Sequence, residues 1–465
     1  MRNILFICLL LIASVVYAQS DDENDFIVVN QINITGNEIT RREIVLREMT
    51  IRSGDTISRT ELEKHIKESR ENLLNTSLFN FADITVNEVS DSENINIDVQ
   101  LTERWYLWPI PFLRYADRNI MAYFEEGRLE RISYGGDLIY NNFLGRQHRL
   151  DLTIIAGYNQ KYAISYDIPY LTNKKMMGLY VAAGFCFDKE SAYATKKDKV
   201  VFYQAESGHA HSAFNAVVNP YLRLGYRDKL SLAITYDDRD FDKNISILND
   251  DFANAHGTRF QYFSLSLDFK HDYRDIHPYP LNGYYAELEV TKKGLGLTDS
   301  DVNFFYAKMI LDKYFHIKGR WYWASNLTLR LADSGSPRYF LNEGLGYGND
   351  IVRGYDLYVV DAADYGIMKN NLKFEIYKKA EGYISGIRNN KFGKFHLAFY
   401  ANLFFDLGYA WKGGDDDLSR LREKMLFGTG IGLDMVTYYD RVFRFEYGFN
   451  TLGEGALSIH FVAPI

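Results

Sequence analysis

The sequence predicts a mainly β protein, in which a small α+β domain over residues 26–104 precedes a 16-stranded transmembrane antiparallel β-barrel over residues 105–465. Three observations predict this fold. Segments after residue 105 alternate apolar and polar residues with a period of two, as barrel strands do. The chain holds 36 Tyr and 31 Phe but only 8 Pro, and it begins with an export signal. No later stretch is long and apolar enough for a membrane-spanning helix, so a membrane-embedded sheet would have to close on itself.

The N-terminus is typical of a cleaved export signal. Arg2 begins a short polar start, an apolar run covers residues 4–16, and Ala18 completes a small-x-small cleavage site. We therefore expect residues 1–18 to be a signal peptide. Cys8 lies inside it, which leaves Cys186 as the one thiol of the mature chain and excludes an intramolecular disulfide. The net charge of −8 gives no indication of a nucleic-acid partner.

Residues 26–104 follow the order strand, helix, helix, strand, strand. The first strand, FIVVNQINITG, ends at a turn signal formed by Gly36 and Asn37. Apolar residues then recur at helical spacing in TRREIVLREM and in RTELEKHIKESRENLLNTSLF, with SGDTIS as the break between them. FADITVNEV and NINIDVQLTE alternate as strands. This order predicts two helices packed on a three-stranded sheet.

The same residues resemble a POTRA domain, the periplasmic module of the Omp85 family. The residues that carry the resemblance are Ile32, Ile34, Gly36, Asn37, Ile44, Gly54, Leu78, Phe79 and the segment 99–103. In that family, such domains receive unfolded chains by adding a strand to the edge of their sheet. A general α+β adaptor domain is the alternative.

Beyond residue 105, apolar and polar residues alternate in YAISYDIPY, LDLTIIAGY, FSLSLDFK and VFRFEYGF. A soluble β-sandwich or propeller would also alternate. Long strands, aromatic residues near strand ends and the lack of a blade-length repeat favour a barrel instead. The sequence allows 16 or 17 strands, with the uncertainty between residues 199 and 226. We predict 16, because bacterial barrels have even strand numbers.

Several short motifs in this half resemble the Omp85 family. They are NNFLG at 141–145, DIPYL at 167–171 and the D-x-R-D, P-x-x-G pattern within HDYRDIHPYPLNGYY at 271–285. The last of these, taken alone, would also fit an ordinary polar hairpin.

The most specific motifs are a loop and a strand that follow. The segment 333–366 is too long for an ordinary hairpin connection, and such loops are usually functional or disordered. Within it, Val352, Arg353, Gly354 and Tyr355 resemble the family's VRGF/Y loop motif. The second strand after the loop reads LAFYANLFFDLGYAW.

In that strand, alternation places Phe404, Asp406 and Gly408 on the lumen side. They match the family's F-x-D-x-G signature, whose acid bonds the loop arginine. An arginine carried into a barrel lumen needs an acceptor, and its planar fork suits a carboxylate. We therefore predict that Arg353 and Asp406 form a loop-locking pair. An exposed arginine on a mobile loop is the alternative.

The sequence contains no catalytic motif such as G-x-S-x-G, H-E-x-x-H or a phosphate loop. His209 and His211 are the one close histidine pair, and two histidines do not make a metal site. We therefore expect no catalytic residue, no metal site, no cofactor and no enzymatic activity.

The resemblance implies a protein of the bacterial outer membrane with its N-terminal domain in the periplasm. It implies assembly, insertion or translocation of unfolded outer-membrane or secreted proteins, with the lipid bilayer and accessory periplasmic or lipoprotein subunits as further partners. A secretion channel for a dedicated partner is the runner-up, and a porin-like diffusion channel or a barrel enzyme is the alternative from another class. The chain ends at Ile465 rather than at an aromatic residue, and Phe461 is the candidate for that terminal role.

Overall fold

The computed structural model describes residues 26–89, 94–115, 132–172, 176–255, 257–298, 300–333, 338–383, 394–413, 419–437 and 441–460. The expected signal peptide, with Cys8, and the C-terminal residues Phe461 and Ile465 lie outside these ranges. No helix in the described ranges is long and apolar enough to cross a membrane.

The N-terminal domain places two helices against one sheet. Its elements are β1 (Phe26–Thr35), α2 (Arg42–Glu48), β2 (Thr56–Ser58), α3 (Arg59–Asn75), β3 (Phe79–Glu88) and β4 (Asn94–Glu103). The sheet order is β2-β1-β4-β3, so the sheet has four strands rather than the three that the sequence predicted. The extra strand comes from the end of SGDTIS, which pairs antiparallel with β1 and buries Ile57 before Ser58 caps α3.

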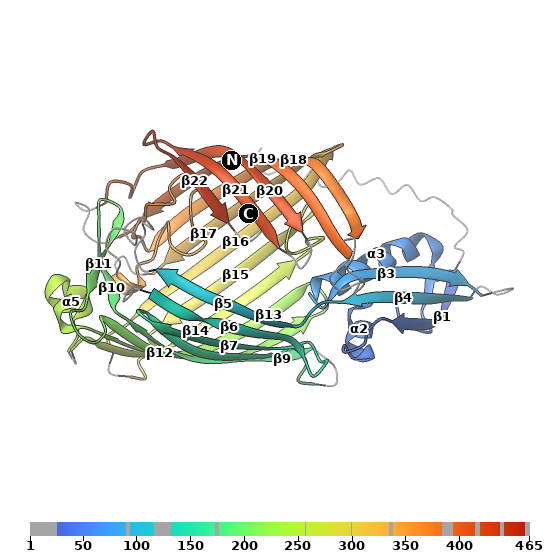
Figure 1. Cartoon of the computed structure of the whole chain (residues 1–465), viewed down its shortest axis with the longest axis horizontal. Coiled ribbons are helices and arrows are strands. Elements are labelled where there is room, and N and C mark those ends of the chain that lie inside the picture. Colours follow the sequence, from blue (N-terminus) through green and yellow to red (C-terminus); the bar gives the residue numbers. More distant parts are fainter. Residues whose placement is uncertain are drawn as a thin grey trace, which may run out of the picture.

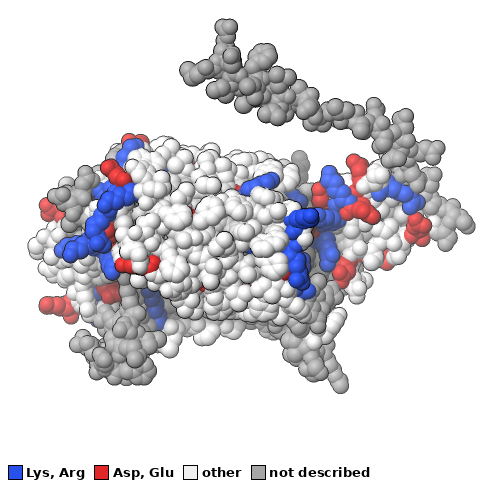
Figure 2. Space-filling view, turned by 90° about the horizontal axis from the view of Figure 1, so that it is seen from above, with Lys and Arg blue, Asp and Glu red and all other residues white. Residues whose placement is uncertain are grey.

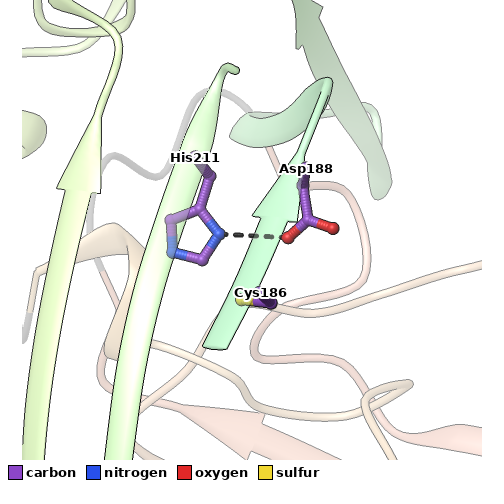
Figure 3. A group of neighbouring side chains, drawn as sticks. All are labelled: Cys186, Asp188 and His211. Atoms are coloured by element: carbon purple, nitrogen blue, oxygen red, sulfur yellow. Dashed lines mark hydrogen bonds and ion pairs between the residues drawn. The ribbon is translucent and has the colours of Figure 1, made fainter. Parts of the chain in front are cut away.

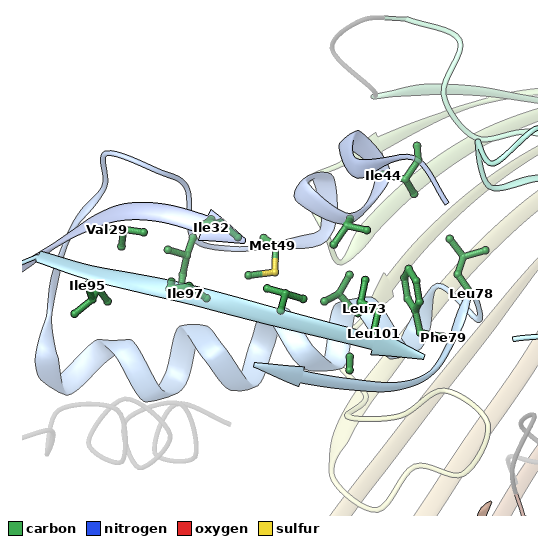
Figure 4. Packing of buried hydrophobic residues seen from close by; sticks show 14 of the residues in the cluster. Val29, Ile32, Ile44, Met49, Leu73, Leu78, Phe79, Ile95, Ile97 and Leu101 are labelled. Carbon is green, nitrogen blue, oxygen red and sulfur yellow. The ribbon is translucent and has the colours of Figure 1, made fainter. Parts of the chain in front are cut away.

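One apolar core holds this domain together (Figure 4). Val29 and Ile32 of β1 and Ile97 of β4 point from the sheet toward the helices, where they meet Met49 and Leu73. These side chains are almost fully removed from water, which stabilises the domain through the burial of apolar area.

The rest of the chain forms an antiparallel 16-stranded sheet in the described residues, which confirms the predicted fold class. Its strands are β5 (Leu107–Tyr115), β6 (Ile132–Phe143), β7 (His148–Gly157), β8 (Gln160–Ile168), β9 (Met177–Asp188), β12 (His211–Leu224), β13 (Asp228–Phe241), β14 (Arg259–Asp272), β15 (Gly283–Lys293), β16 (Phe304–Lys318), β17 (Trp321–Ala332), β18 (Asp364–Tyr383), β19 (Lys394–Trp411), β20 (Leu426–Thr437), β21 (Val442–Asn450) and β22 (Gly455–His460). Within the described ranges, three short helices lie in the connections: α5 (Lys243–Leu248), η2 (Asp250–Phe252) and η3 (Tyr339–Leu341).

A separate hairpin explains why the strand count was uncertain between residues 199 and 226. Strands β10 (Glu190–Lys196) and β11 (Lys199–Gln204) pair with each other and leave the wall, while β9 pairs directly with β12. The hairpin alternates like a wall strand, so periodicity could not separate the two. Figure 1 shows it at the end of the barrel opposite the N-terminal domain.

The outer surface of the barrel is apolar around its middle. Figure 2 shows a broad band largely without charged side chains, with charges gathered toward the two ends. Large apolar side chains are exposed there, among them Leu152, Ile154, Ile164, Leu232, Ile234, Leu267, Leu311, Leu327 and Leu403. A band of this kind is what a barrel wall presents to lipid.

The N-terminal domain is held against one end of the barrel by polar contacts. Arg223 donates from Nη1 to Glu48 Oε1 at 3.0 Å, and the Glu48 side chain is almost fully buried. The NNFLG turn also contacts the domain: Asn142 donates to the Thr40 hydroxyl at 2.8 Å, and the Arg41 amide donates to the Gly145 carbonyl at 3.0 Å. This motif therefore joins the domain to the barrel.

Candidate functional site: the loop inside the barrel

Residues 338–363 of the loop between β17 and β18 lie inside the barrel, against the inner faces of β18, β19 and β21. Its apolar residues form one buried cluster with wall residues of β18, β19 and β20, made of Leu345, Val352, Tyr355, Tyr358, Val360, Ala362, Tyr365, Ile367, Ala410, Leu421 and Leu426. A loop that buries this many apolar groups is a fixed part of the fold rather than a mobile surface segment.

Arg353 is held by two carboxylates and an amide. It donates to Asp406 through both Nη2, at 2.5 Å, and Nε, at 2.8 Å, which is a bidentate arginine–carboxylate pair. Its Nη1 donates to Asn371 Oδ1 at 2.8 Å and to Glu446 Oε1 at 3.0 Å. The Arg353 backbone amide also donates to Asp406, at 3.1 Å. Three strands of the wall therefore hold one loop side chain.

The surroundings of Arg353 stabilise its charged guanidinium. The guanidinium carbon lies 4.0 Å from the ring centroid of Phe404, a cation–π contact. Burial alone would lower the pKa of Arg353, but the carboxylates of Asp406 and Glu446 outweigh burial and raise it. Since Asp406 is fully buried, removing the arginine would leave a buried carboxylate with fewer partners.

Glycines in the loop and in the wall allow this close packing. Gly354 has φ +90° and its Cα approaches the backbone of Phe449, where a side chain would collide with the Phe449 carbonyl. A Cβ on Gly408 would collide with the Val352 side chain, and a Cβ on Gly428 would collide with the Arg353 carbonyl oxygen. Position 408 of the motif therefore requires glycine, because the Val352 side chain of the loop packs directly on it.

Tyr355 joins the loop to the last hairpin of the barrel. Its hydroxyl lies 2.6 Å from the hydroxyl of Thr451 and accepts from the Thr451 amide at 3.2 Å. Asn450 donates from its side chain to the Gly354 carbonyl at 2.8 Å. Thr451 and Asn450 lie at the turn between β21 and β22, so the loop position and the end of the barrel are coupled by contact.

The structure thus brings together all seven residues of the two motifs, and it adds partners that the sequence did not reveal. Asn371 comes from β18, the next strand, and Gly428, Glu446, Asn450 and Thr451 come from strands or turns far along the chain. The one signal for any of them was the alternation in VFRFEYGF, which puts Glu446 on the polar side of its strand. Which acid an arginine meets depends on the strand register, and single-sequence periodicity does not give it.

A second polar cluster lies at the end of the lumen nearest the N-terminal domain. The turn 273–282, between β14 and β15, carries Tyr279 into the barrel, where its hydroxyl donates to Asp434 at 2.7 Å. Arg444 donates to the same carboxylate at 2.9 Å. The Tyr279 ring packs on Tyr400 at 4.9 Å between centroids, and the Lys373 ammonium lies 4.2 Å from the Tyr279 ring.

The loop and this turn enter the lumen from opposite ends and are linked through neighbouring residues of β21. Arg444 Nε lies 3.9 Å from Glu446 Oε1, and Glu446 contacts Arg353. The β10–β11 hairpin adds a cover at the far end, because the Val359 amide of the loop donates to the Asp198 carbonyl at 2.9 Å. The loop, the Tyr279 turn and the hairpin therefore occupy part of the lumen, whereas inward residues of β7, β8, β9 and β12 line a cavity of about 400 Å³.

A smaller cluster of Cys186, Asp188 and His211 lies on the lumen side at the far end of β9 and β12 (Figure 3). His211 Nδ1 lies 3.2 Å from Asp188, and its buried Nε2 has no hydrogen-bond partner in the described residues. A cysteine nucleophile would need that nitrogen as its base. In the ladder, Lys161 lies opposite Cys186. The cluster is accounted for as a hydrogen-bonded group.

Comparison with known families now places the N-terminal domain. Residues 27–104 match the POTRA family, described as a surface antigen variable number repeat. Residues 27–104 are therefore similar to a POTRA domain, as the sequence predicted. No curated protein matches the sequence as a relative.

The whole chain resembles two solved barrels of the Omp85 superfamily. BamA from Haemophilus ducreyi lacking POTRA domains 1–3 matches with a TM-score of 0.50 and 15% identity, over 94% of this chain and 83% of that chain. CdiB from Escherichia coli matches with a TM-score of 0.55 and 12% identity, over 94% of this chain and 75% of that chain. The chain therefore has the fold of these barrels, a POTRA-like domain followed by a 16-stranded barrel in the described residues, and the predicted fold class is confirmed.

The POTRA-like domain touches the turn that enters the lumen. Asn75, at the end of α3, accepts from the His277 amide at 3.1 Å and donates to the Asp275 carbonyl at 3.2 Å. Two residues further along the same turn, Tyr279 enters the barrel. The position of the POTRA domain therefore bears directly on the closure of the lumen.

Adding one methyl group at Gly428 is expected to displace the loop. Gly428→Ala places a Cβ against the Arg353 carbonyl, and such overpacking costs about 1–3 kcal/mol. Gly366→Ala is the matched control, because its Cβ would have as its nearest neighbour the Leu329 side chain at 3.7 Å, an ordinary contact. Limited proteolysis within residues 338–363 should become faster in Gly428→Ala and stay unchanged in Gly366→Ala. Equal resistance of both variants would contradict the packing described for the loop.

Proposed function

We propose that this protein inserts client β-strand proteins into the outer membrane, with its POTRA domain in the periplasm. The observation that carries the proposal is that, in the described residues, the two terminal strands of the barrel have no ladder between them, while a loop, a turn and a hairpin of the chain occupy part of its lumen. In the strand order, β22 and β5 are the two ends, and the described residues contain no pairing of one with the other. Figure 1 shows both strands on the near wall of the barrel.

A lumen that is partly occupied in this way argues against passage of a folded chain along the barrel axis. The locked loop, the Tyr279 turn and the β10–β11 hairpin all lie in or over that path. An unpaired sheet edge in lipid, by contrast, leaves backbone groups without partners, each at a cost of several kcal/mol. A client strand that pairs with such an edge satisfies its own backbone groups and those of the barrel together.

The POTRA domain supports the same proposal from the other side of the membrane. Strand β3 lies at the edge of its sheet, where a further strand can be added. The domain is fixed to the barrel through Glu48 and Arg223, so a segment bound at its sheet is held close to the barrel end. We infer that clients are captured by strand addition in the periplasm and passed to the barrel edge.

Reconstitution into liposomes tests this function. An unfolded outer-membrane barrel added to vesicles that contain the protein should fold and insert faster than with empty vesicles, while the vesicles show little ion conductance. A wide, steady conductance without faster insertion would overturn the proposal and identify a diffusion channel. Conductance that opens with one dedicated partner protein, again without insertion, would identify a secretion channel.

A further inference from the structure

Strand β5 carries prolines at two alternate positions, 109 and 111, although proline removes a backbone hydrogen-bond donor. Proline is rare in sheets except where its nitrogen faces away from a ladder. The side to which these two nitrogens point therefore decides what the prolines do, and the register of the neighbouring strands gives that side.

The register of β5 on β6 places the prolines on the outer side. In an antiparallel ladder, residues alternate between pairs that exchange two hydrogen bonds and pairs that exchange none. The Asn141 amide donates to the Tyr106 carbonyl at 2.8 Å, and the register then continues with Leu107 opposite Tyr140. Even-numbered residues of β5 therefore bond to β6, and odd-numbered residues point toward the outer edge.

The pairing of β6 with β7 independently places the proline nitrogens on the same side of β5. The Tyr158 amide donates to the Ile132 carbonyl at 2.9 Å, so even-numbered residues of β6 bond to β7. Odd-numbered residues of β6 therefore bond to β5, and these lie opposite the even-numbered residues of β5. Both ladders place the nitrogens of Pro109 and Pro111 on the edge that faces away from β6.

The outer edge of β5 can consequently accept hydrogen bonds at its centre but cannot donate them there. The carbonyl groups of Pro109 and Pro111 are acceptors on that edge, whereas neither residue has an N–H group. If a strand paired with the whole of this edge, its own carbonyl groups opposite Pro109 and Pro111 would have no N–H donor. In lipid, where water cannot replace a missing donor, such a pairing is weak at its centre.

We propose that Pro109 and Pro111 keep the edge of β5 from sealing against β22, so that this edge remains exchangeable and takes up an incoming client β-strand whose amide groups donate to the two proline carbonyls. This inference rests on the proposed function. In the described part of the chain, β22 has six residues against nine in β5, so these six residues can pair with only part of the β5 edge. The partner is thus a strand that offers donors, and its pairing is reversible.

Edge prolines have a simpler role in many sheets, where they prevent edge-to-edge aggregation. In that case, restoring the donors would cause association between barrels and would leave client insertion by monomers unchanged. The two explanations therefore differ in a measurable way.

The test is the double variant Pro109→Val/Pro111→Val, which restores two donors with side chains suited to a strand. Ile110→Val is the matched control, because residue 110 bonds to β6 and its substitution leaves the outer edge unchanged. Hydrogen exchange of β22 amides should slow by about tenfold or more in the double variant as a sealed seam forms, and client insertion should slow in parallel. The control should match the wild type in both measurements.

The outcomes separate the inference from the function on which it rests. If the wild type inserts clients and the double variant inserts them at the same rate with unchanged β22 exchange, the proline inference is overturned and the insertion function stands. Faster association of barrels with unchanged insertion would also overturn it, in favour of aggregation control. If the wild type inserts no client, the proposed function fails, while slower β22 exchange in the double variant would still support the role of the prolines in the seam.

Discussion

Replacing Arg353 with alanine is expected to destabilise the packed loop by about 3–5 kcal/mol, because it leaves Asp406 and Glu446 buried without their common partner. Proteolysis within residues 338–363 should accelerate strongly, and client insertion should fall. Arg353→Lys should recover only part of the loss, since an ammonium cannot make the bidentate contact with Asp406.

The control for this prediction is a second arginine–carboxylate pair in the same protein. Arg259 donates to Asp238 with a similar fork, but the Arg259 side chain is 57% exposed. Arg259→Ala should therefore cost about 0–1 kcal/mol. The double variant Arg353→Ala/Asp406→Ala should lose little more than either single variant, because both remove the same contact. Fully additive losses would show that the two side chains act separately.

Replacing Tyr279 with alanine is expected to open the lumen and to destabilise the barrel end by about 3–5 kcal/mol, the usual cost of removing a buried aromatic ring. The change removes the hydroxyl contact with Asp434, the packing on Tyr400 and the ring beside the Lys373 ammonium. Planar-bilayer recordings should then show larger conductance, and thermal unfolding in detergent should begin at lower temperature.

Two further variants serve as controls for the Tyr279 prediction. Tyr279→Phe keeps the ring and loses one hydrogen bond, so it should cost about 1 kcal/mol and leave the conductance low. Tyr273→Ala alters an aromatic of the same turn that is 44% exposed and should also leave the conductance low. A conductance that rises equally in Tyr273→Ala and Tyr279→Ala would show that the turn as a whole, and not the inserted ring, closes the lumen.

The sequence predicted more of the architecture than of the candidate site. Period-two alternation and the aromatic content predicted a barrel, because a wall between lipid and lumen imposes that pattern on every strand. Two features were missed for one physical reason. Thr56–Ser58 and the β10–β11 hairpin are extended segments whose partner strands, and not their own residues, decide whether they join a sheet.

The two motifs predicted the contact between Arg353 and Asp406 only through the family resemblance. Alternation placed Asp406 on the inner face, but its distance from the loop is set by how Val352 lies on Gly408 and how the Arg353 carbonyl lies on Gly428. Glu446 and the Tyr279–Asp434 contact depend on pairings across 93 and 155 residues of sequence. Such contacts follow from the register of the closed sheet, which a periodic pattern leaves undetermined.

We propose that clients meet the barrel at its seam, between β5 and β22. Site-specific photo-crosslinking tests this proposal most directly. A photoreactive amino acid is placed at Leu113 of β5 or at Leu457 of β22, which are 78% and 68% exposed, with Ile234 of β13 as the exposed control in the barrel wall away from the seam. During insertion, we expect an unfolded barrel client to be captured at Leu113 and Leu457 and not at Ile234. Equal capture at all three positions, or capture at none while insertion proceeds, would contradict the seam as the site of function.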